Sequence, residues 1–342
     1  MSEAVAKARQ CDAAGRHSEA ISHLVAGVNA KDAEAATVLG KRLLIGDRAP
    51  NLPRDGAQLI AEAHELGSAE AAAMLSVLYA LGTKQGFGLE HAVEKLAEAA
   101  ARGWQPAQGQ LQLLAGEHGT SGAAPDWAGV AASIDLDAWL SVPAGADLST
   151  APHIRSFPDF ASAAVCRWLI DKASGRLTRA LVYEALSRRT TVSDTRTNTA
   201  ATFNLLDADL VSVLVQNRIA ASLGLSLRQL EPFAVLHYAE GEEITEHYDF
   251  VDPNIPNYEE EVRQKGQRIV TFLLYLNDDY EAGETQFCEL GISHKGQCGE
   301  GLFFVNSHPD GSANVATLHA GRPPRHGEKW IVSQFVRDRA TF

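Results

Sequence analysis

The chain has 342 residues, a length that accommodates about two domains. Hydrophobic residues make up 45% and charged residues 21% of it, a globular balance that excludes a largely disordered chain. Its 43 acidic and 30 basic residues give a net charge of −13. We therefore expect no nucleic-acid or membrane partner, because nucleic acids and anionic lipids carry charge of the same sign.

The N-terminus and the cysteines are typical of a cytoplasmic protein. Residues 1–7 carry an early acid and lead into no continuous apolar segment, unlike a secretory signal. No stretch of about 18 apolar residues occurs, so we expect no membrane-spanning helix. The cysteines, which form no CxxC pair, are Cys11, Cys166, Cys288 and Cys298. We expect reduced thiols, but the sequence leaves open whether Cys288 and Cys298 form a disulfide.

Residues 3–116 repeat with a period of 36 residues. The aligned large apolar residues are Leu39, Leu75 and Leu111, and Leu24, Ile60 and Leu96. The aligned small residues are Ala35, Ala71 and Ala107, Ala63 and Ala99, Gly46 and Gly82, and Gly67 and Gly103. Such a period predicts stacked helix–turn–helix units, in which small residues let neighbouring helices approach closely. The segment resembles the Sel-one-like variety of the tetratricopeptide repeat, with two clear copies and a partial one.

The repeat resemblance implies a domain that binds proteins, although a role that only supports the second domain stays open. Glycine and proline interrupt the helical pattern over residues 117–150, which we interpret as a linker with a short ordered piece around Trp127–Trp139. We thus predict a helical repeat domain at 1–116 (period 36), the linker at 117–150 and a second domain at 151–342.

The second domain changes from helices to strands along the chain. Asp159 is expected to cap a helix that runs through Ile170, and a longer helix is expected at Asp207–Leu223. The strand-like segments lie at 233–238, 268–276, 301–305, 315–319 and 328–336. Short strands separated by glycine and proline predict an antiparallel barrel or double sheet with supporting helices. The fold class is therefore α + β, with an α-helical repeat array before the sheets.

Residues 246–249 read Glu-His-Tyr-Asp and carry the first chemical signal. Side chains two residues apart on a strand point to the same face, so His247 and Asp249 would project together. An imidazole and a carboxylate need one more ligand to hold a divalent metal in the facial arrangement of non-haem Fe(II) oxygenases. His319, on a distant strand-like segment, can supply that ligand. A His-x-Asp pair alone, however, is more often structural.

Lys329 follows His319 by ten residues, on a strand where it alternates with Ile331 and Ser333 toward the interior. A lysine among apolar neighbours in a barrel is destabilising unless an anion meets it. A dicarboxylate would be such an anion, with its keto-acid end on the metal and its far carboxylate on Lys329.

With these motifs, residues 154–342 resemble the prolyl 4-hydroxylase branch of the Fe(II)- and 2-oxoglutarate-dependent dioxygenases. The stretches that carry the resemblance are Leu236–Gly241, His247–Phe250, Arg268–Asn277, Gly283–Thr285, Pro309–Gly311, Leu318–Gly321, Pro323 and Gly327–Trp330. The resemblance implies a double-stranded β-helix (jelly-roll) barrel with supporting helices. It also implies a dioxygenase that consumes 2-oxoglutarate and O2, releases succinate and CO2, and uses ascorbate as a reductant.

By this resemblance, His247, Asp249 and His319 are the Fe(II) ligands. Lys329 forms the salt bridge to the distal carboxylate of 2-oxoglutarate. These four residues make up the expected catalytic set.

Four further positions match the branch less specifically. Tyr238 matches a tyrosine that lines the cosubstrate pocket, and Thr271 and Tyr275 share a strand face from which they can hydrogen-bond the cosubstrate. Simple packing in the barrel is the alternative for these three. Arg196, within Asp194–Asn198, matches a loop that helps to bind peptide, and we expect it to contact the substrate.

The usual substrate in this branch is a prolyl residue of a peptide or protein, and the helical repeats would help to hold that partner. Two alternatives stay open: a hydroxylase of a free amino acid or other small molecule, and a repeat-based binding scaffold with an idle barrel. The polar stretch Val251–Gln267 is interpreted as a lid over the substrate, with a solvated loop as the alternative. The acidic run at 259–261 is interpreted as a solvated face.

Overall fold

The computed structural model divides the chain into two compact units. One unit comprises Met1–Leu140 and Leu205–Leu214, and the other comprises Ser141–Asn204 and Val215–Phe342. The structure describes residues 1–83, 85–116, 125–184, 189–191, 193–252, 255, 258–308 and 310–340. Pro309, which contributed to the family resemblance, lies outside the described residues. Among the helices in these ranges, none combines the length and the apolar composition that spanning a bilayer requires.

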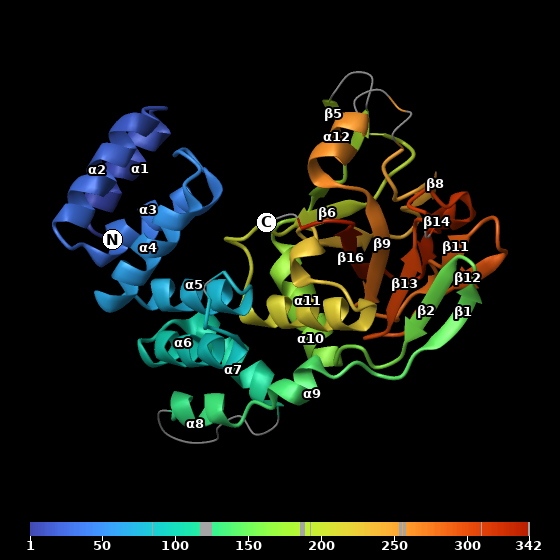
Figure 1. Ribbon diagram of the computed structural model, residues 1–342, viewed down its shortest axis with the longest axis horizontal. Helices are drawn as coiled ribbons and strands as arrows, with labels where there is room; N and C mark the ends of the chain where they lie inside the picture. Colours follow the sequence, from blue (N-terminus) through green and yellow to red (C-terminus); the bar gives the residue numbers. More distant parts are fainter. Residues whose placement is uncertain are drawn as a thin grey trace. The chain divides into compact units, whose positions relative to one another are not determined.

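The first unit is a helical array, as the period predicts. Its helices are α1 (Glu3–Ala13), α2 (His17–Asn29), α3 (Ala33–Ile45), α4 (Pro53–Glu65), α5 (Ala69–Ala80), α6 (Leu89–Ala101), α7 (Gln105–Ala115), α8 (Trp127–Ala132) and α9 (Leu136–Leu140). The starts of α2, α4 and α6 are 36 residues apart, and so are those of α3, α5 and α7. The period therefore corresponds to three complete helix pairs, and Figure 1 shows the successive helices side by side.

The repeated residues occupy equivalent places in these helix pairs. The aligned positions with side chains at most 1% exposed include Ala35, Ala71, Ala107, Leu24, Ile60 and Leu96. Gly67 and Gly103 follow α4 and α6 with φ angles of 95° and 87°. Lys31 has a φ of 60° at the same place after α2. The first pair thus keeps the same turn without a glycine.

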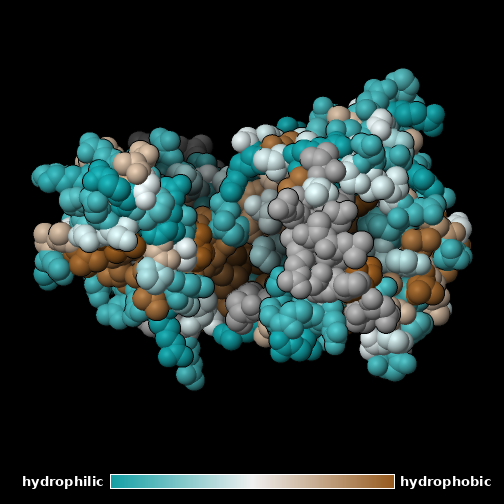
Figure 2. Space-filling model, turned by 90° about the horizontal axis from the view of Figure 1, so that it is seen from above, coloured by the Kyte–Doolittle hydropathy of each residue, from teal (hydrophilic) through white to brown (hydrophobic). Residues whose placement is uncertain are grey.

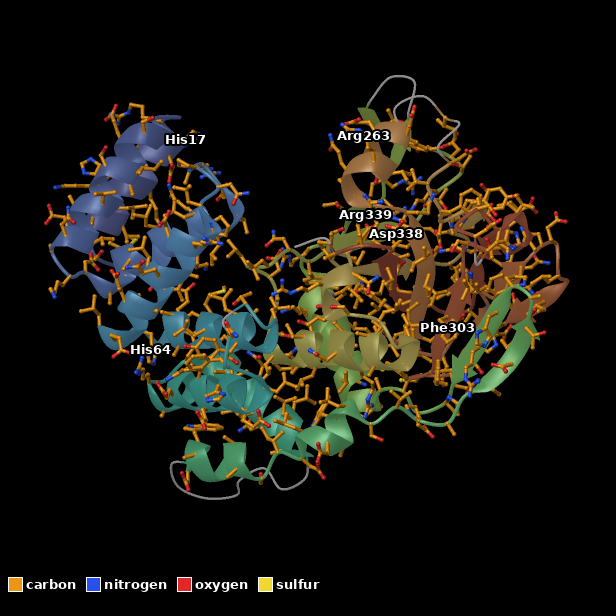
Figure 3. All side chains as sticks on the ribbon, viewed as in Figure 1. His17, His64, Arg263, Phe303, Asp338 and Arg339 are labelled. Atoms are coloured by element: carbon orange, nitrogen blue, oxygen red, sulfur yellow. The ribbon has the colours of Figure 1, made fainter. Side chains whose placement is uncertain are left out.

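A polar cluster also joins successive repeats. His64 of α4, labelled in Figure 3, is 6% exposed, and its Nε2 lies 2.5 Å from Oε2 of Glu98 on α6. Arg102 donates a hydrogen bond to the His64 carbonyl oxygen at 3.0 Å. Because the groups are partly withdrawn from water, each polar atom that is paired here avoids a desolvation penalty.

The second unit contains two antiparallel sheets, which confirms the α + β class. The larger sheet has the order β1 (Ala146–Thr150), β2 (His153–Phe157), β13 (Gly301–Val305), β9 (Arg268–Tyr275), β16 (Lys329–Arg337), β7 (Ala234–Tyr238), β6 (Thr199–Thr202) and β3 (Thr178–Arg179). The smaller sheet has the order β12 (Ile292–His294), β11 (Thr285–Phe287), β14 (His319–Gly321) and β8 (Ile244–His247). Two short ribbons pair β4 (Val182–Glu184) with β5 (Arg189–Thr191) and β10 (Glu281–Ala282) with β15 (Pro324–Arg325).

The two sheets are consistent with the jelly roll that we predicted, but they do not close into one barrel, because no strand pairing joins them within the described ranges. The core lies between the sheets, where Phe287 of β11 and Phe304 of β13 are completely buried with ring centroids 5.1 Å apart. Helix α10 (Ala163–Ser174) precedes β3, and α11 (Leu210–Leu223) reaches the opposite face of the larger sheet, where Gln216 donates to Gln334 at 2.9 Å. Figure 1 shows both helices beside that sheet.

Two local predictions are wrong. Asp159 does not cap α10, because it lies in a turn with a φ of 54°, and the Ser162 side chain instead accepts a hydrogen bond from the Val165 amide. Residues Val315–Thr317 form the 3-10 helix η3 rather than a strand, and the strand begins at His319. Another such turn, η2, covers Leu227–Gln229. In the segment that we interpreted as a linker, α8 and α9 cover the ordered piece that we expected around Trp127–Trp139. Strand β1, at the end of the same segment, was not predicted.

The stretch interpreted as a lid contains the helix α12 (Tyr258–Lys265), which the sequence did not predict. Glu259 and Glu260 of its acidic run are exposed, as we interpreted. Glu261 is only partly exposed, because Arg337, 1% exposed at the end of β16, donates to Glu261 Oε1 at 2.8 Å. Arg339 donates to the Arg263 carbonyl oxygen at 3.2 Å, and Figure 3 labels both residues. The helix is therefore attached to the end of β16, and its role as a lid stays a prediction.

Gly40 of α3 and Gly56 of α4 provide a test of how closely neighbouring helices of the array pack. A Cβ added to Gly56 would lie 2.7 Å from the Gly40 carbonyl oxygen and 2.8 Å from the Leu44 amide. We expect Gly56→Ala to lower the free energy of unfolding of the helical unit by about 1–3 kcal/mol, although helix propensity alone would favour alanine by about 1 kcal/mol. Thermal unfolding followed by circular dichroism measures this. The control is Gly175→Ala, where a Cβ would meet nothing within 4 Å. A Gly56→Ala variant as stable as the parent would contradict the close crossing.

Candidate metal centre

Two neighbouring strands of the smaller sheet bring together residues that are distant in sequence. His247 on β8 is the direct antiparallel partner of His319 on β14. Asp249 follows the end of β8, with Oδ1 3.6 Å from His247 Nε2 and Oδ2 3.5 Å from His319 Nε2. Within the described chain, these three residues form a group whose ligand atoms all lie within 4.8 Å of one another. The structure thus gathers the three residues that the sequence identified as ligands.

The second nitrogen of each imidazole is held by the backbone. His247 Nδ1 lies 2.8 Å from the Thr245 carbonyl oxygen, and His319 Nδ1 lies 2.9 Å from the Thr317 carbonyl oxygen. A carbonyl oxygen only accepts, so each Nδ1 carries the hydrogen, and the lone pair of a neutral ring is then on Nε2. Metal-binding histidines in proteins are oriented by this kind of contact.

The charges of the group suit a divalent cation. Burial by itself raises the pKa of Asp249, but the facing His319 and His247 and the Thr271 hydroxyl outweigh it and hold that pKa well below its usual value. Burial lowers the pKa of His319 to about 4, so this ring is neutral at pH 7. Two imidazoles and one anionic carboxylate form the donor set that is typical of non-haem Fe(II). The residues present therefore fit the metal that the resemblance implies.

Lys329 is a buried amine that lacks a paired carboxylate in the described part of the chain. It is 1% exposed, and its Nζ donates to the Gly283 carbonyl oxygen at 2.7 Å. Its Nζ lies 5.4 Å and 5.8 Å from the ring centroids of Tyr238 and Tyr275. Among the described residues, no carboxylate forms an ion pair with it. Burial lowers the pKa of Lys329 to about 7, so an anionic ligand here would supply the missing counter-charge.

The other predicted cosubstrate residues fall into two groups. Tyr238 and Tyr275 are completely or almost completely buried beside Lys329, and the Tyr275 hydroxyl donates to Thr285 Oγ1 at 2.9 Å. Burial raises the pKa of Tyr238 to about 12, so its hydroxyl keeps its hydrogen at neutral pH. Thr271 instead contacts the cluster of predicted ligands, because its hydroxyl donates to Asp249 Oδ2 at 2.8 Å.

Arg196 lies beside the strand that carries His247. It forms an antiparallel bridge with Ile244 of β8, and the Thr245 amide donates to the Thr195 carbonyl oxygen at 2.9 Å. Arg196 Nε donates to Oδ1 of the completely buried Asn198 at 3.0 Å. The structure therefore places the predicted substrate contact at the edge of the smaller sheet, next to β8.

The sequence reasoning missed Asn306, which directly follows β13. Its Nδ2 donates to Thr271 Oγ1 at 2.9 Å, one hydrogen bond away from Asp249. The available signal was alternation, since Asn306 shares a strand face with Phe304 and is a polar residue on the core side. No spacing rule connects it to His247 or Asp249, because the contact depends on the pairing of β13 with β9.

The part of the chain that holds these residues is similar to known proteins. Residues 233–337 match the family model of the 2OG-Fe(II) oxygenase superfamily. Residues 233–337 are thus similar to the domain of this family. All four residues of the expected catalytic set lie within the matched range. The chain is 33% identical over 141 residues to probable prolyl 4-hydroxylase 9 of Arabidopsis thaliana, a match that covers 36% of this chain and 47% of the relative. The chain thus spans about half the length of that relative.

Two solved structures are similar to parts of the chain. A viral collagen prolyl hydroxylase from Paramecium Bursaria Chlorella virus-1, in its 2OG complex, is 25% identical with a TM-score of 0.42, and the match covers 54% of this chain and 95% of that protein. A Sel1 repeat protein from Oxalobacter formigenes is 22% identical with a TM-score of 0.31, and the match covers 41% of this chain and 58% of that protein.

The cluster of His247, Asp249 and His319 predicts metal binding that a single substitution weakens. We expect His319→Ala to weaken Co(II) or Fe(II) binding by at least about 100-fold, because one of three ligands is lost. An anaerobic calorimetric titration of the full chain with the metal measures the affinity. The control is His237→Ala, since His237 lies 3.1 Å from Thr199 Oγ1 and 3.0 Å from Glu328 Oε2 and is not among the clustered residues. Equal affinity in the two variants would exclude His319 as a ligand.

Proposed function

We propose that this protein is an Fe(II)- and 2-oxoglutarate-dependent dioxygenase that hydroxylates prolyl residues of a peptide or protein and releases succinate and CO2. One observation carries the proposal: a His247–Asp249–His319 cluster and the buried Lys329, which lacks a paired carboxylate among the described residues, occur in one oxygenase domain. The identity with an Arabidopsis prolyl 4-hydroxylase supports proline as the target. When bound, Fe(II) and 2-oxoglutarate supply the oxidising chemistry that hydroxylates an unactivated C–H bond.

The residues of the chain bind and orient in this proposal. His247, Asp249 and His319 would hold the metal through two imidazoles and one carboxylate. Lys329 pairs with the distal carboxylate of 2-oxoglutarate, and the buried rings of Tyr238 and Tyr275 exclude water from that ion pair. Exclusion of water strengthens the attraction, because the local dielectric constant is lower than that of bulk water.

The peptide would contact Arg196, whose place beside β8 supports this role. The helical repeats would hold the protein that carries the target proline. On the face that Figure 2 shows, apolar residues form a band across the helical unit between polar ones, which is a surface suited to a partner.

Ascorbate would serve as the reductant. We also propose a cytoplasmic location, supported by four cysteines that are all free thiols, Cys288 and Cys298 included.

The activity itself is testable with the full chain. With Fe(II), 2-oxoglutarate, ascorbate and a proline-containing peptide, we expect one succinate for each oxygen atom that the peptide gains, measured by mass spectrometry. The same peptide with alanine in place of each proline should leave only slow, uncoupled succinate release. Free proline is the third arm, and its hydroxylation without any peptide turnover would favour the small-molecule alternative. Equal succinate release with all three additions would contradict the proposed substrate.

Lys329 predicts a pH dependence of cosubstrate binding. Its pKa of about 7 means that the amine loses its charge as the pH rises through this value. The 2-oxoglutarate anion needs the charged form, so its Kd should rise about fivefold between pH 7 and pH 8, as one group with that pKa titrates. Calorimetry with a redox-inert metal measures this.

The matched variant is Lys329→Arg, because a guanidinium stays charged over this whole range. We expect weaker binding overall from the larger group, with an affinity that no longer changes between pH 7 and pH 8. The same pH dependence in the parent and in the variant would assign the titrating group to another residue.

A further inference from the structure

Asn306 is a completely buried residue that the proposed chemistry does not use. It contacts Thr271, the residue that donates a hydrogen bond to the proposed metal ligand Asp249. Its Nδ2 donates to Thr271 Oγ1 at 2.9 Å, and the Thr271 hydroxyl donates to Asp249 Oδ2 at 2.8 Å. A hydroxyl has a single hydrogen. With the amide of Asn306 donating to the Thr271 oxygen, that hydrogen points to Asp249. The carboxylate can only accept, so the amide and the carboxylate together occupy the acceptor and donor sides of the Thr271 hydroxyl and hold it in place.

The main chain of Asn306 begins a second series of contacts, which ends at His319. Its carbonyl oxygen accepts from the Asn314 amide at 2.9 Å. The Asn314 carbonyl oxygen accepts from Thr317 Oγ1 at 2.7 Å, in the turn η3. The Thr317 carbonyl oxygen lies 2.9 Å from His319 Nδ1. The position at the end of β13 is therefore connected to two of the three proposed ligands, through its side chain and through its backbone.

Packing alone does not account for an asparagine at this position. Its Oδ1 is buried and has no hydrogen-bond partner in the part of the chain that the structure describes. A buried acceptor without a partner is destabilising, and an apolar side chain of similar volume would avoid that penalty. The donor side of the amide, aimed at Thr271, is the property that leucine would not provide.

We propose that Asn306 is a positioning residue for the metal centre, which acts through the Thr271 hydroxyl to hold the Asp249 carboxylate in place for the metal. The proposal rests on the proposed function, because it requires a metal at this cluster. Contacts of this type typically change metal affinity by about 10- to 100-fold when they are removed. Asn306 touches no reacting group, so its effect should appear in metal binding before any turnover occurs.

The test is a double-mutant cycle on the full chain, read as the Co(II) affinity without cosubstrate. Asn306→Leu and Thr271→Val should each weaken binding about tenfold. The variant that carries both should lose no more than the single ones, because both break the same series of contacts. Thr271→Ser keeps the hydroxyl and should restore the affinity. The control is Thr37→Val, a buried threonine of α3 whose hydroxyl donates to the Ala33 carbonyl oxygen at 2.7 Å.

The outcomes separate this inference from the proposed function. If the parent chain binds metal and Asn306→Leu binds it equally well, the positioning role is wrong while the metal centre stands. Losses that multiply in the double variant would also overturn it, since the two residues would then act independently. If the parent chain binds no divalent metal, both proposals fail. Asn306→Ala replaces the leucine variant if that one does not fold, with the same expected loss.

Discussion

The register between β8 and β14 is the constraint on which the candidate site depends. Antiparallel pairing puts His247 directly opposite His319 on one face of the smaller sheet. Neither imidazole is placed by its own sequence neighbours alone, because two strands of the larger sheet, β9 and β13, lie between β8 and β14 along the chain. A shift of one residue would turn one ring to the other face of the sheet and separate the cluster.

The site also depends on both sheets at once. Asp249 comes from the end of β8 in the smaller sheet, whereas the Thr271 hydroxyl that donates to it comes from β9 in the larger one. Lys329 comes from β16 of the larger sheet and is held by the carbonyl oxygen of Gly283. The aromatic core between the sheets, with Phe287 against Phe304, fixes the distance across which these side chains meet. The packing of the core therefore determines the geometry of the polar groups.

The buried charged groups of the site favour two ligands of opposite charge. The anionic Asp249 and two imidazoles face one another and favour a cation, and Lys329 is a buried amine whose charged form favours an anion. Buried charges are stable when they are paired. A ligand set of one metal ion and one dicarboxylate would satisfy both needs, and this complementarity gives the proposed cosubstrate its physical basis.

Period and alternation in the sequence determined the helical array, the α + β class and the candidate pair His247 and Asp249, because residues on one face of a helix or strand follow a local spacing. The resemblance to the prolyl 4-hydroxylase branch completed the candidate set with the roles of His319 and Lys329. Tertiary structure decided what no local spacing encodes. It turned the repeat's partial copy into a full helix pair, assigned Thr271 to Asp249 rather than to the Lys329 pocket, and brought Asn306 into the same series of contacts. Those relations arise from pairing between strands that are far apart along the chain, and only the folded sheets establish which strands are neighbours.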